Sequence, residues 1–309
     1  MTTDFPILGG VLPVLATPFA PGGEPDAEGL RRIARYAIAA GADGVVYPGV
    51  ASEYDMLGPD ERSRLTAIVA AEAQGKVPLV VGGSAGDPAT TEAVARQARE
   101  LGAAALMVMA PKSLVAAGDV IAFFRRVAAA ADGVPIMLQN APPPTGSGLP
   151  VDVVLAVAHA VGEIAYVKEE AMPSGARITQ TQAGAPATLR GVLGGAGGRY
   201  ITDELARGAL GTMPACELTE IHVALMRAHR AGDRARVRHF FNRMLPLLNF
   251  QAVFRMAMTK ETLRRRGIIA HAGKRAPGPE LDPGDHRELC ELLAEVADLL
   301  DPPARENHG

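Results

Sequence analysis

The sequence predicts a (β/α)8 barrel followed by a C-terminal helical region. Short apolar runs rich in Val, Ile, Leu and Met alternate with longer Ala-, Arg- and Glu-rich segments from residue 11 to residue 213. Eight such runs occur before the alternation stops, as in a barrel of this type. The competing open doubly wound sheet usually carries a glycine-rich phosphate loop after its first strand, and residues 16–19 do not supply one. We therefore expect the barrel in residues 1–217 and the helical region in residues 218–309.

The expected strands are short runs of aliphatic and β-branched residues, typical of buried parallel strands. They cover residues 11–15, 45–47, 79–81, 105–109, 135–139, 164–168, 188–193 and 209–213. The expected helices of the barrel show apolar residues at helical spacing or boundary signals such as Pro59 and Gly102. They cover residues 27–40, 59–73, 90–101, 118–131, 151–160, 175–184 and 201–207.

Only helices are expected after Cys216. They cover residues 220–231, 234–248, 250–266 and 285–300, with a proline-rich linker at 277–283 and a frayed tail at 301–309. A local basic patch, which we interpret as a solvated helix end, consists of Arg264, Arg265, Arg266, Lys274 and Arg275.

Composition excludes several classes of function. A net charge of -3 and a pI near 6.2 argue against a basic surface for nucleic acid. No apolar run reaches the roughly 18 residues of a membrane span, and the first residues lack the features of a signal peptide. Two cysteines provide neither a disulfide framework nor a metal cluster. We expect a cytoplasmic protein without a nucleic-acid or membrane partner.

The sixth expected strand ends in Lys168, which Glu169 and Glu170 follow. Strand side chains alternate between faces, so Lys168 and Glu170 should point one way and Glu169 the other. Active sites of such barrels lie at the carboxyl ends of the strands. Apolar neighbours favour the neutral, nucleophilic amine, and a nearby carboxylate can stabilise an iminium and move protons. The alternatives are a strand capped by solvated charges and the rival amine of Lys112, which lies in a polar loop.

Other kinds of site have weaker signals. The histidines show no metal-ligand spacing beyond a helix face that His222 and His229 could share, so we expect no metal. The glycines from Gly194 to Gly198 could cradle a phosphate or allow a substrate to approach the backbone closely. No G-x-S-x-G motif indicates a serine nucleophile. We expect no cofactor.

Four motifs carry a resemblance to a known family: Ala16-Thr17-Pro18-Phe19, Gly49-Val50-Ala51-Ser52-Glu53, Gln139-Asn140-Ala141-Pro142 and Val167-Lys168-Glu169. With them the chain resembles the dihydrodipicolinate synthase and N-acetylneuraminate lyase family of class I aldolases and dehydratases, over nearly its whole length. The resemblance implies that Lys168 forms a Schiff base with the ketone of pyruvate or another 2-oxo acid. It also implies a homo-oligomer, either a tetramer or a dimer.

The departures from the family pattern point to one branch. Gln139 stands where aldol-forming members usually have a proton-shuttling tyrosine, and an amide has no titrating proton at neutral pH. Pro144 stands where dihydrodipicolinate synthases have an arginine for the aldehyde substrate, which argues against lysine biosynthesis. The pattern Lys-x-Glu with glutamine in the tyrosine position looks like the branch that dehydrates 2-keto-3-deoxy sugar acids, such as 2-keto-3-deoxy-L-arabonate.

These inferences predict a lyase of carbohydrate metabolism. Lys168, Glu170 and Gln139 are the expected catalytic residues, with Glu170 as general base and acid. The expected substrate-binding residues are Thr17, Ala51, Ser52, Glu53, Gly194 and Gly195, with the amides near Ala51 and Ser52 and the Ser52 hydroxyl holding the carboxylate. Aldol addition or retro-aldol cleavage on pyruvate is the alternative reaction, and a non-catalytic 2-oxo acid-binding protein is the second alternative.

Overall fold

The computed structural model describes residues 7–114 and 116–300. The chain forms two compact units, each built from two stretches of sequence. The first unit comprises Met1–Gly10 and Pro78–Met213, and the second comprises Val11–Val77 and Pro214–Gly309. The chain passes from one unit to the other at three points, the first of which lies within the short strand β1 (Gly10–Val11). The barrel boundary that we expect after residue 217 stays a prediction.

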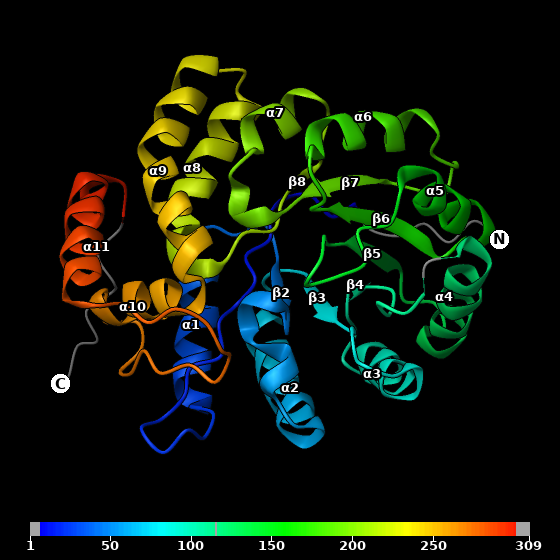
Figure 1. Cartoon of the computed structure of the whole chain (residues 1–309), viewed down its shortest axis with the longest axis horizontal. Coiled ribbons are helices and arrows are strands. Elements are labelled where there is room, and N and C mark those ends of the chain that lie inside the picture. Colours follow the sequence, from blue (N-terminus) through cyan, green and yellow to red (C-terminus); the bar gives the residue numbers. More distant parts are fainter. Residues whose placement is uncertain (1–6, 115, 301–309) are drawn as a thin grey trace. The chain divides into compact units, whose positions relative to one another are not determined.

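The first unit is built on a parallel sheet. Its strands pair in chain order, so each βα unit returns beside the preceding strand, and Figure 1 shows them side by side. Nearly every strand residue is buried, which explains the continuous apolar runs of the sequence. The strands are β3 (Leu79–Gly82), β4 (Ala105–Val108), β5 (Ile136–Asn140), β6 (Ile164–Glu169), β7 (Gly191–Gly194) and β8 (Gly211–Thr212).

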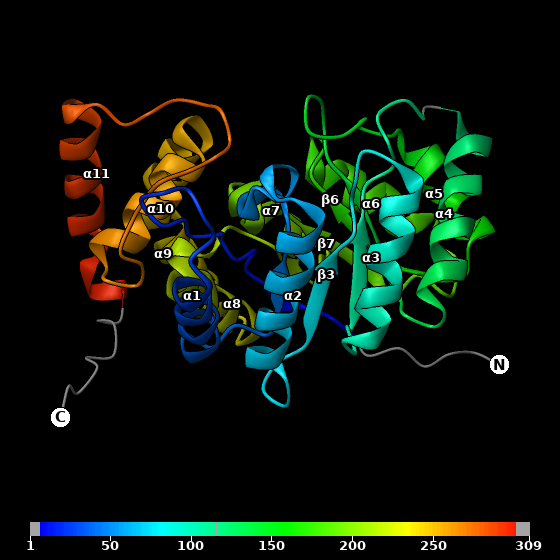
Figure 2. The ribbon, with the colours of Figure 1, turned by 90° about the horizontal axis from the view of Figure 1, so that it is seen from below.

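The helices of the first unit connect these strands, and each packs on the next, as α3 does on α4 (Figure 2). Asp87 caps α3 by accepting a hydrogen bond from the N–H of Thr90, and Gly102 follows the helix with φ +66°. The helices are α3 (Pro88–Glu100), α4 (Ala117–Ala131), α5 (Val151–Ala160), α6 (Ser174–Ala183) and α7 (Ile201–Ala206).

The second unit has its own small parallel pairing. Val14 bridges to Val46 of β2 (Val45–Tyr47) and to Ala215. Helices α1 (Ala27–Ala39) and α2 (Pro59–Ala73) pack on each other. The 3-10 turns η1 (Val50–Ser52) and η2 (Tyr54–Met56) lie between β2 and α2 and form the loop that the sequence singled out.

The C-terminal stretch of the second unit is helical, as predicted. Helix α9 packs against both α8 and α11 (Figure 1). Asp282 caps α11 through the N–H groups of Gly284 and Asp285. The elements are η4 (Cys216–Leu218), α8 (Thr219–Arg230), α9 (Arg234–Phe254), α10 (Met256–Arg265), α11 (Pro283–Glu295) and η5 (Ala297–Leu299). None of the described helices combines the length and apolar character needed to span a bilayer.

The order of elements, eight strands each followed by a helix and then further helices, confirms the predicted (β/α)8 class with a C-terminal helical region. Several predicted boundaries were wrong: the seventh and eighth strands begin later than expected, and α9 continues to Phe254. The first strand is two residues long, because Pro13 has no N–H for continuous pairing. The expected helix over 250–266 is interrupted at Arg255, whose φ of 47° and ψ of −119° are not helical. The last helix ends at Glu295 rather than 300. The expected frayed tail, 301–309, lies outside the described residues.

Candidate active site

The carboxyl ends of β5 and β6 place four polar side chains on two faces of the first unit's sheet. Gln139 pairs with Lys168, and Asn140 pairs with Glu169. Paired residues of neighbouring strands point to the same face, and successive residues point to opposite faces. Lys168 and Gln139 therefore share one face, and Glu169 and Asn140 share the other.

The Glu170 carboxylate contacts both Lys168 and Gln139. Its Oε1 lies 3.2 Å from Lys168 Nζ, and its Oε2 accepts a hydrogen bond from Gln139 Nε2 at 2.6 Å. Oε1 also accepts a hydrogen bond from the N–H of Ala196 at 3.2 Å. The N–H of Glu170 donates to the carbonyl oxygen of Asn140 at 3.1 Å, which anchors the residue at the end of the sheet. The structure thus brings the three expected catalytic residues together, while their roles in catalysis stay predictions.

The contacts of Glu170 set its charge. Burial by itself raises the pKa of Glu170, but the charge of Lys168 and the hydrogen bonds from Gln139 and Ala196 outweigh it and lower the pKa. The carboxylate is therefore ionised at neutral pH and able to accept a proton. Lys168 is only 3% exposed. Because its Nζ lies within 3.2 Å of the carboxylate, a proton can pass between the two groups without reaching bulk water.

Glu169, on the opposite face, makes contacts that connect neighbouring elements of the fold. Its carboxylate accepts hydrogen bonds from Asn140 Nδ2 at 3.0 and 3.2 Å and from the N–H of Ala171 at 2.8 Å. Arg177 of α6 lies 3.2 Å away and balances its charge. Burial raises the pKa of Glu169, and these partners oppose that shift. Glu169 therefore fixes the end of β6 to helix α6, behind the face that carries Lys168.

Gly194 and Gly195 are glycines because two carboxyl side chains occupy the space beside them. A Cβ atom on Gly194 would lie 1.9 Å from Glu204 Oε2, and one on Gly195 would lie 2.5 Å from Glu170 Cγ. Ser174 donates a hydrogen bond to Glu204 Oε1 at 2.7 Å, and burial raises the pKa of Glu204 to about 7. The binding of substrate by the two glycines stays a prediction; the contact that the structure shows is with these carboxyl groups.

The second unit brings together the other expected binding residues around the loop from Gly49 to Glu53. Thr17 Oγ1 donates to the carbonyl oxygen of Ser52 at 2.6 Å and lies 2.9 Å from the Tyr47 hydroxyl. The Ser52 hydroxyl donates to the Leu15 carbonyl oxygen and accepts from the N–H of Gly49 at 2.9 Å. The Ser52 N–H donates to the Gly49 carbonyl oxygen at 2.9 Å. Ser52 is thus fully engaged in shaping the loop, and its contact with a substrate stays a prediction.

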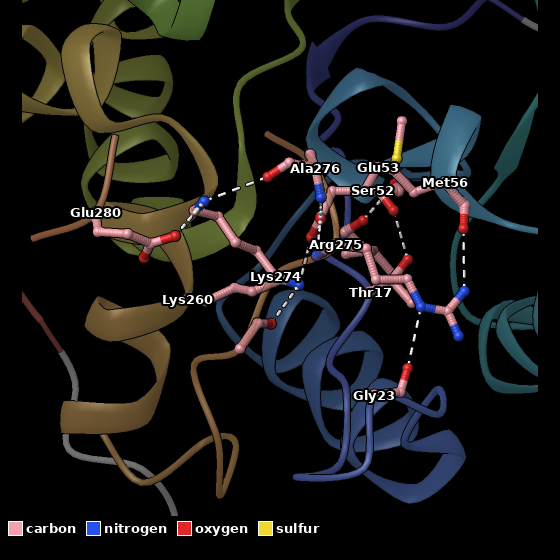
Figure 3. A network of polar contacts seen from close by, with 12 residues as sticks. Thr17, Gly23, Ser52, Glu53, Met56, Lys260, Lys274, Arg275, Ala276 and Glu280 are labelled. Atoms are coloured by element: carbon pink, nitrogen blue, oxygen red, sulfur yellow. Dashed lines mark hydrogen bonds and ion pairs between the residues drawn. The ribbon is translucent and has the colours of Figure 1, made fainter. Parts of the chain in front are cut away.

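Glu53 is almost completely buried, at 1% exposure, and its carboxylate is held by the C-terminal stretch of the same unit. Lys260 forms an ion pair with Oε1, and the N–H groups of Arg275 and Ala276 donate to Oε2. Figure 3 shows this network, with Lys260 and Arg275 reaching the loop that carries Ser52 and Glu53. Substrate binding by Glu53 itself stays a prediction.

The competing sites of the sequence have no comparable surroundings. Lys112 is exposed, as expected of a solvated amine. His222 is buried, and its Nδ1 lies within hydrogen-bonding distance, 2.9 Å, of the carbonyl oxygen of Leu218, the residue before α8. Over residues 7–114 and 116–300, no three His, Cys, Asp or Glu side chains form a group that could hold a metal ion.

The family assignment follows from the match of the whole chain. The model of the dihydrodipicolinate synthetase family matches residues 7–296. The chain belongs to this family. Members of the dihydrodipicolinate synthetase family are Schiff-base lyases, so the chain is an enzyme of this class, as predicted. That Lys168, the amine that contacts Glu170, is the lysine that forms the Schiff base stays a prediction.

Two curated members of the dihydrodipicolinate synthetase family differ in their reactions. The chain is 30% identical over 298 residues to L-2-keto-3-deoxyarabonate dehydratase from Azospirillum brasilense, covering 95% of this chain and 94% of that one. It is 31% identical over 314 residues to 4-hydroxy-tetrahydrodipicolinate synthase from Thermomicrobium roseum, covering 97% and 99%. Identity at this level establishes the family and leaves the substrate open.

The solved structures of the family share the fold. The dihydrodipicolinate synthase of Rhodopseudomonas palustris superposes with a TM-score of 0.85 at 26% identity, over 93% of this chain and 97% of that one. Two contacts of the present chain were not predicted from its sequence. Glu204 joins the site from α7, and Lys260 reaches Glu53 from α10. The adjacent glycines Gly194 and Gly195 were the available hint of the first.

Proposed function

We propose that this enzyme dehydrates a 2-keto-3-deoxy sugar acid, such as 2-keto-3-deoxy-L-arabonate, through a Schiff base on Lys168. The observation that supports the proposal most is the ionised Glu170, which contacts Lys168 on one oxygen and Gln139 on the other. A glutamine fixes a carboxylate but supplies no proton at neutral pH. The acid–base work of the site therefore falls to Glu170.

The reaction begins when Lys168 transfers a proton to Glu170 and its free amine attacks the C2 ketone of the substrate. Loss of water from the carbinolamine gives an iminium ion, which acidifies the C3 proton. Glu170, ionised again after protonating the departing water, removes that proton and leaves an enamine. The enamine expels the C4 hydroxyl, which takes the proton from Glu170 and departs as water. Hydrolysis of the unsaturated iminium releases the product and restores Lys168.

The carboxylate of the substrate needs donors of its own. We assign this role to the loop from Gly49 to Glu53, in particular to the backbone N–H of Ala51. The Ser52 N–H and hydroxyl already hold the turn together, so their use by a substrate would require them to exchange partners. We further propose a cytoplasmic homo-oligomer, a tetramer or dimer, as the family resemblance implies.

The second candidate is aldol addition or retro-aldol cleavage on pyruvate. The similarity to the Thermomicrobium roseum synthase favours it, because the same imine serves both reactions. A panel of 2-oxo acids and keto-deoxy sugar acids, with mass detection of product and of borohydride-reduced adduct, decides between them. Dehydration leaves a keto acid lighter by one water, and cleavage leaves pyruvate and an aldehyde. Absence of any adduct on Lys168 would indicate a protein that only binds 2-oxo acids.

A further inference from the structure

Lys260 is a second buried lysine, and no step of the proposed reaction uses it. It lies on α10 with 0% exposure. Its Nζ forms an ion pair with Glu53 Oε1, donates to the Gly273 carbonyl oxygen at 2.9 Å and lies 4.1 Å from the ring centre of Phe19. Burial lowers the pKa of Lys260 to about 8, against the opposing charge of Glu53. The amine is therefore still charged at neutral pH.

The other carboxylate oxygen of Glu53, Oε2, also has hydrogen-bond partners. Oε2 accepts hydrogen bonds from the N–H of Arg275 at 2.7 Å and from that of Ala276 at 2.5 Å. The Arg275 guanidinium binds both oxygens of Glu61 and the carbonyl oxygen of Met56. The stretch from Gly273 to Ala276 and the turns around Glu53 are thus tied together at several points (Figure 3).

The backbone at Glu53 explains why the loop requires this support. Glu53 has φ 57° and ψ 42°, the left-handed region that a non-glycine residue adopts at a cost. Glu53 stands between η1 and η2, so its backbone conformation sets the orientation of η1, which contains Ala51 and Ser52, relative to η2. A conformation of this kind persists where surrounding contacts determine it, and the charged contacts of Glu53 do so.

A buried ion pair is a costly way to obtain stability, since apolar residues of similar volume often serve as well or better. A buried ion pair does fix the position and orientation of its two side chains, because moving one of them leaves the other with an unpaired buried charge. We propose that Lys260 is a positioning residue for the substrate carboxylate: through Glu53 it holds the Gly49–Glu53 loop in the conformation that binds a 2-oxo acid. The inference rests on the proposed function of that loop. Lys260 contacts no reacting atom.

The test compares two probes that differ in the carboxylate alone. Pyruvate carries the carboxylate, and methyl pyruvate has an ester in its place. For each, the apparent affinity is measured from the concentration dependence of borohydride trapping on Lys168. A change that merely destabilises the fold weakens both probes alike, whereas loss of the carboxylate site weakens pyruvate alone. The ratio of the two affinities is therefore the readout.

The wild-type enzyme should bind pyruvate more tightly than methyl pyruvate. Lys260→Met should lower this preference about tenfold or more, because a loss of this size is expected when a charge-assisted hydrogen bond is removed. The matched control is Arg264→Met on the same helix, where a 45% exposed arginine pairs with Glu261, and the preference should not change. If Lys260→Met does not fold, the double variant Glu53→Gln with Lys260→Met, which leaves no unpaired charge, replaces it in the same comparison.

The outcomes separate the two proposals. A folded variant that keeps the wild-type preference for pyruvate overturns the role of Lys260 and leaves the loop assignment intact. A wild-type enzyme that traps both probes equally well overturns the loop assignment, and the role of Lys260 with it. A loss of preference in the Lys260 variants with none in Arg264→Met supports both.

Discussion

The side-chain amide of Gln139 donates a hydrogen bond to Glu170, with 2.6 Å between Nε2 and Oε2. The other oxygen of Glu170 faces Lys168 Nζ at 3.2 Å. The amide thus orients the carboxylate toward the amine and stabilises its ionised form, because a donor to a charged acceptor favours the charge. Through these two contacts Gln139 influences the protonation state of the site.

Replacing Gln139 by leucine should raise the pKa of Glu170, since the ionised form loses a donor. The acid limb of kcat/KM against pH should move to higher pH by about one unit, as expected for a hydrogen bond to a charged group. Gln182→Leu, which removes an amide bound to the Gly208 carbonyl oxygen, is the matched control. An unchanged acid limb in Gln139→Leu would show that the amide does not tune Glu170.

Replacing Glu170 by glutamine should abolish turnover. Imine formation should become slower but stay detectable, because water can replace Glu170 in the proton transfers of that step. The proposed reaction needs Glu170 for the C3 proton, and general acid–base catalysis contributes on the order of 10² to 10⁴ in rate. Turnover of the keto-deoxy sugar acid and borohydride-trapped adduct are measured on the same sample. Lys168→Met serves as the reference with neither turnover nor adduct. Full activity in Glu170→Gln is incompatible with its role as base.

The period of a strand was enough to predict part of this site. Because side chains alternate along a strand, the amine of Lys168 and the carboxylate of Glu170 were predicted to lie on the same face. The contact between Lys168 and Glu170 confirms this prediction. The same alternation predicted that Glu169 points to the opposite face, where the structure shows it in contact with Asn140 and Arg177. These are local consequences of strand geometry, which need no knowledge of distant residues.

The contacts missing from the prediction join residues far apart in sequence. Glu204 approaches Gly194 from a different helix, and Lys260 reaches Glu53 across more than two hundred residues. Periodicity tells which face a residue occupies but not which helix covers that face. The positive φ angles of Glu53 and Arg255 were also unpredictable, because neither residue is glycine or asparagine. Tertiary contacts hold the backbone of Glu53 in this conformation.

Replacing Gly195 by alanine should damage catalysis more than stability. The new Cβ would lie 2.5 Å from Glu170 Cγ, so the carboxylate must move away from Lys168 or Gln139. We expect kcat to fall at least about tenfold, as for a misplaced catalytic group. Gly162→Ala is the control, because nothing lies within 4 Å of its Cβ position. Equal kcat values for the two variants would show that the absence of a side chain at Gly195 is not needed to position Glu170.

Glu204 should make the stability of the fold depend on pH. Burial raises its pKa from 4.5 to about 7, with smaller contributions from Ser174, which lowers it, and from Glu170, which raises it. Between these two values the folded state binds more protons than the unfolded state, so the free energy of unfolding falls as pH rises. The raised pKa of Glu204 contributes at most about 3 kcal/mol to the free energy of unfolding. This contribution is fully present below pH 4.5 and is lost above about pH 7.

Glu204→Gln removes this titration, and the variant should lose less stability than the wild type between pH 5 and pH 7.5 in urea unfolding. Glu217 of the second unit, whose pKa burial also raises to about 7, titrates in both proteins. The difference between the two stability curves therefore isolates Glu204. Glu100→Gln, an exposed position on α3, should reproduce the wild-type curve. Parallel curves for wild type and Glu204→Gln would mean that the carboxyl is ionised in the folded protein, in which case Ser174 and the surrounding dipoles stabilise its charge more than burial opposes it.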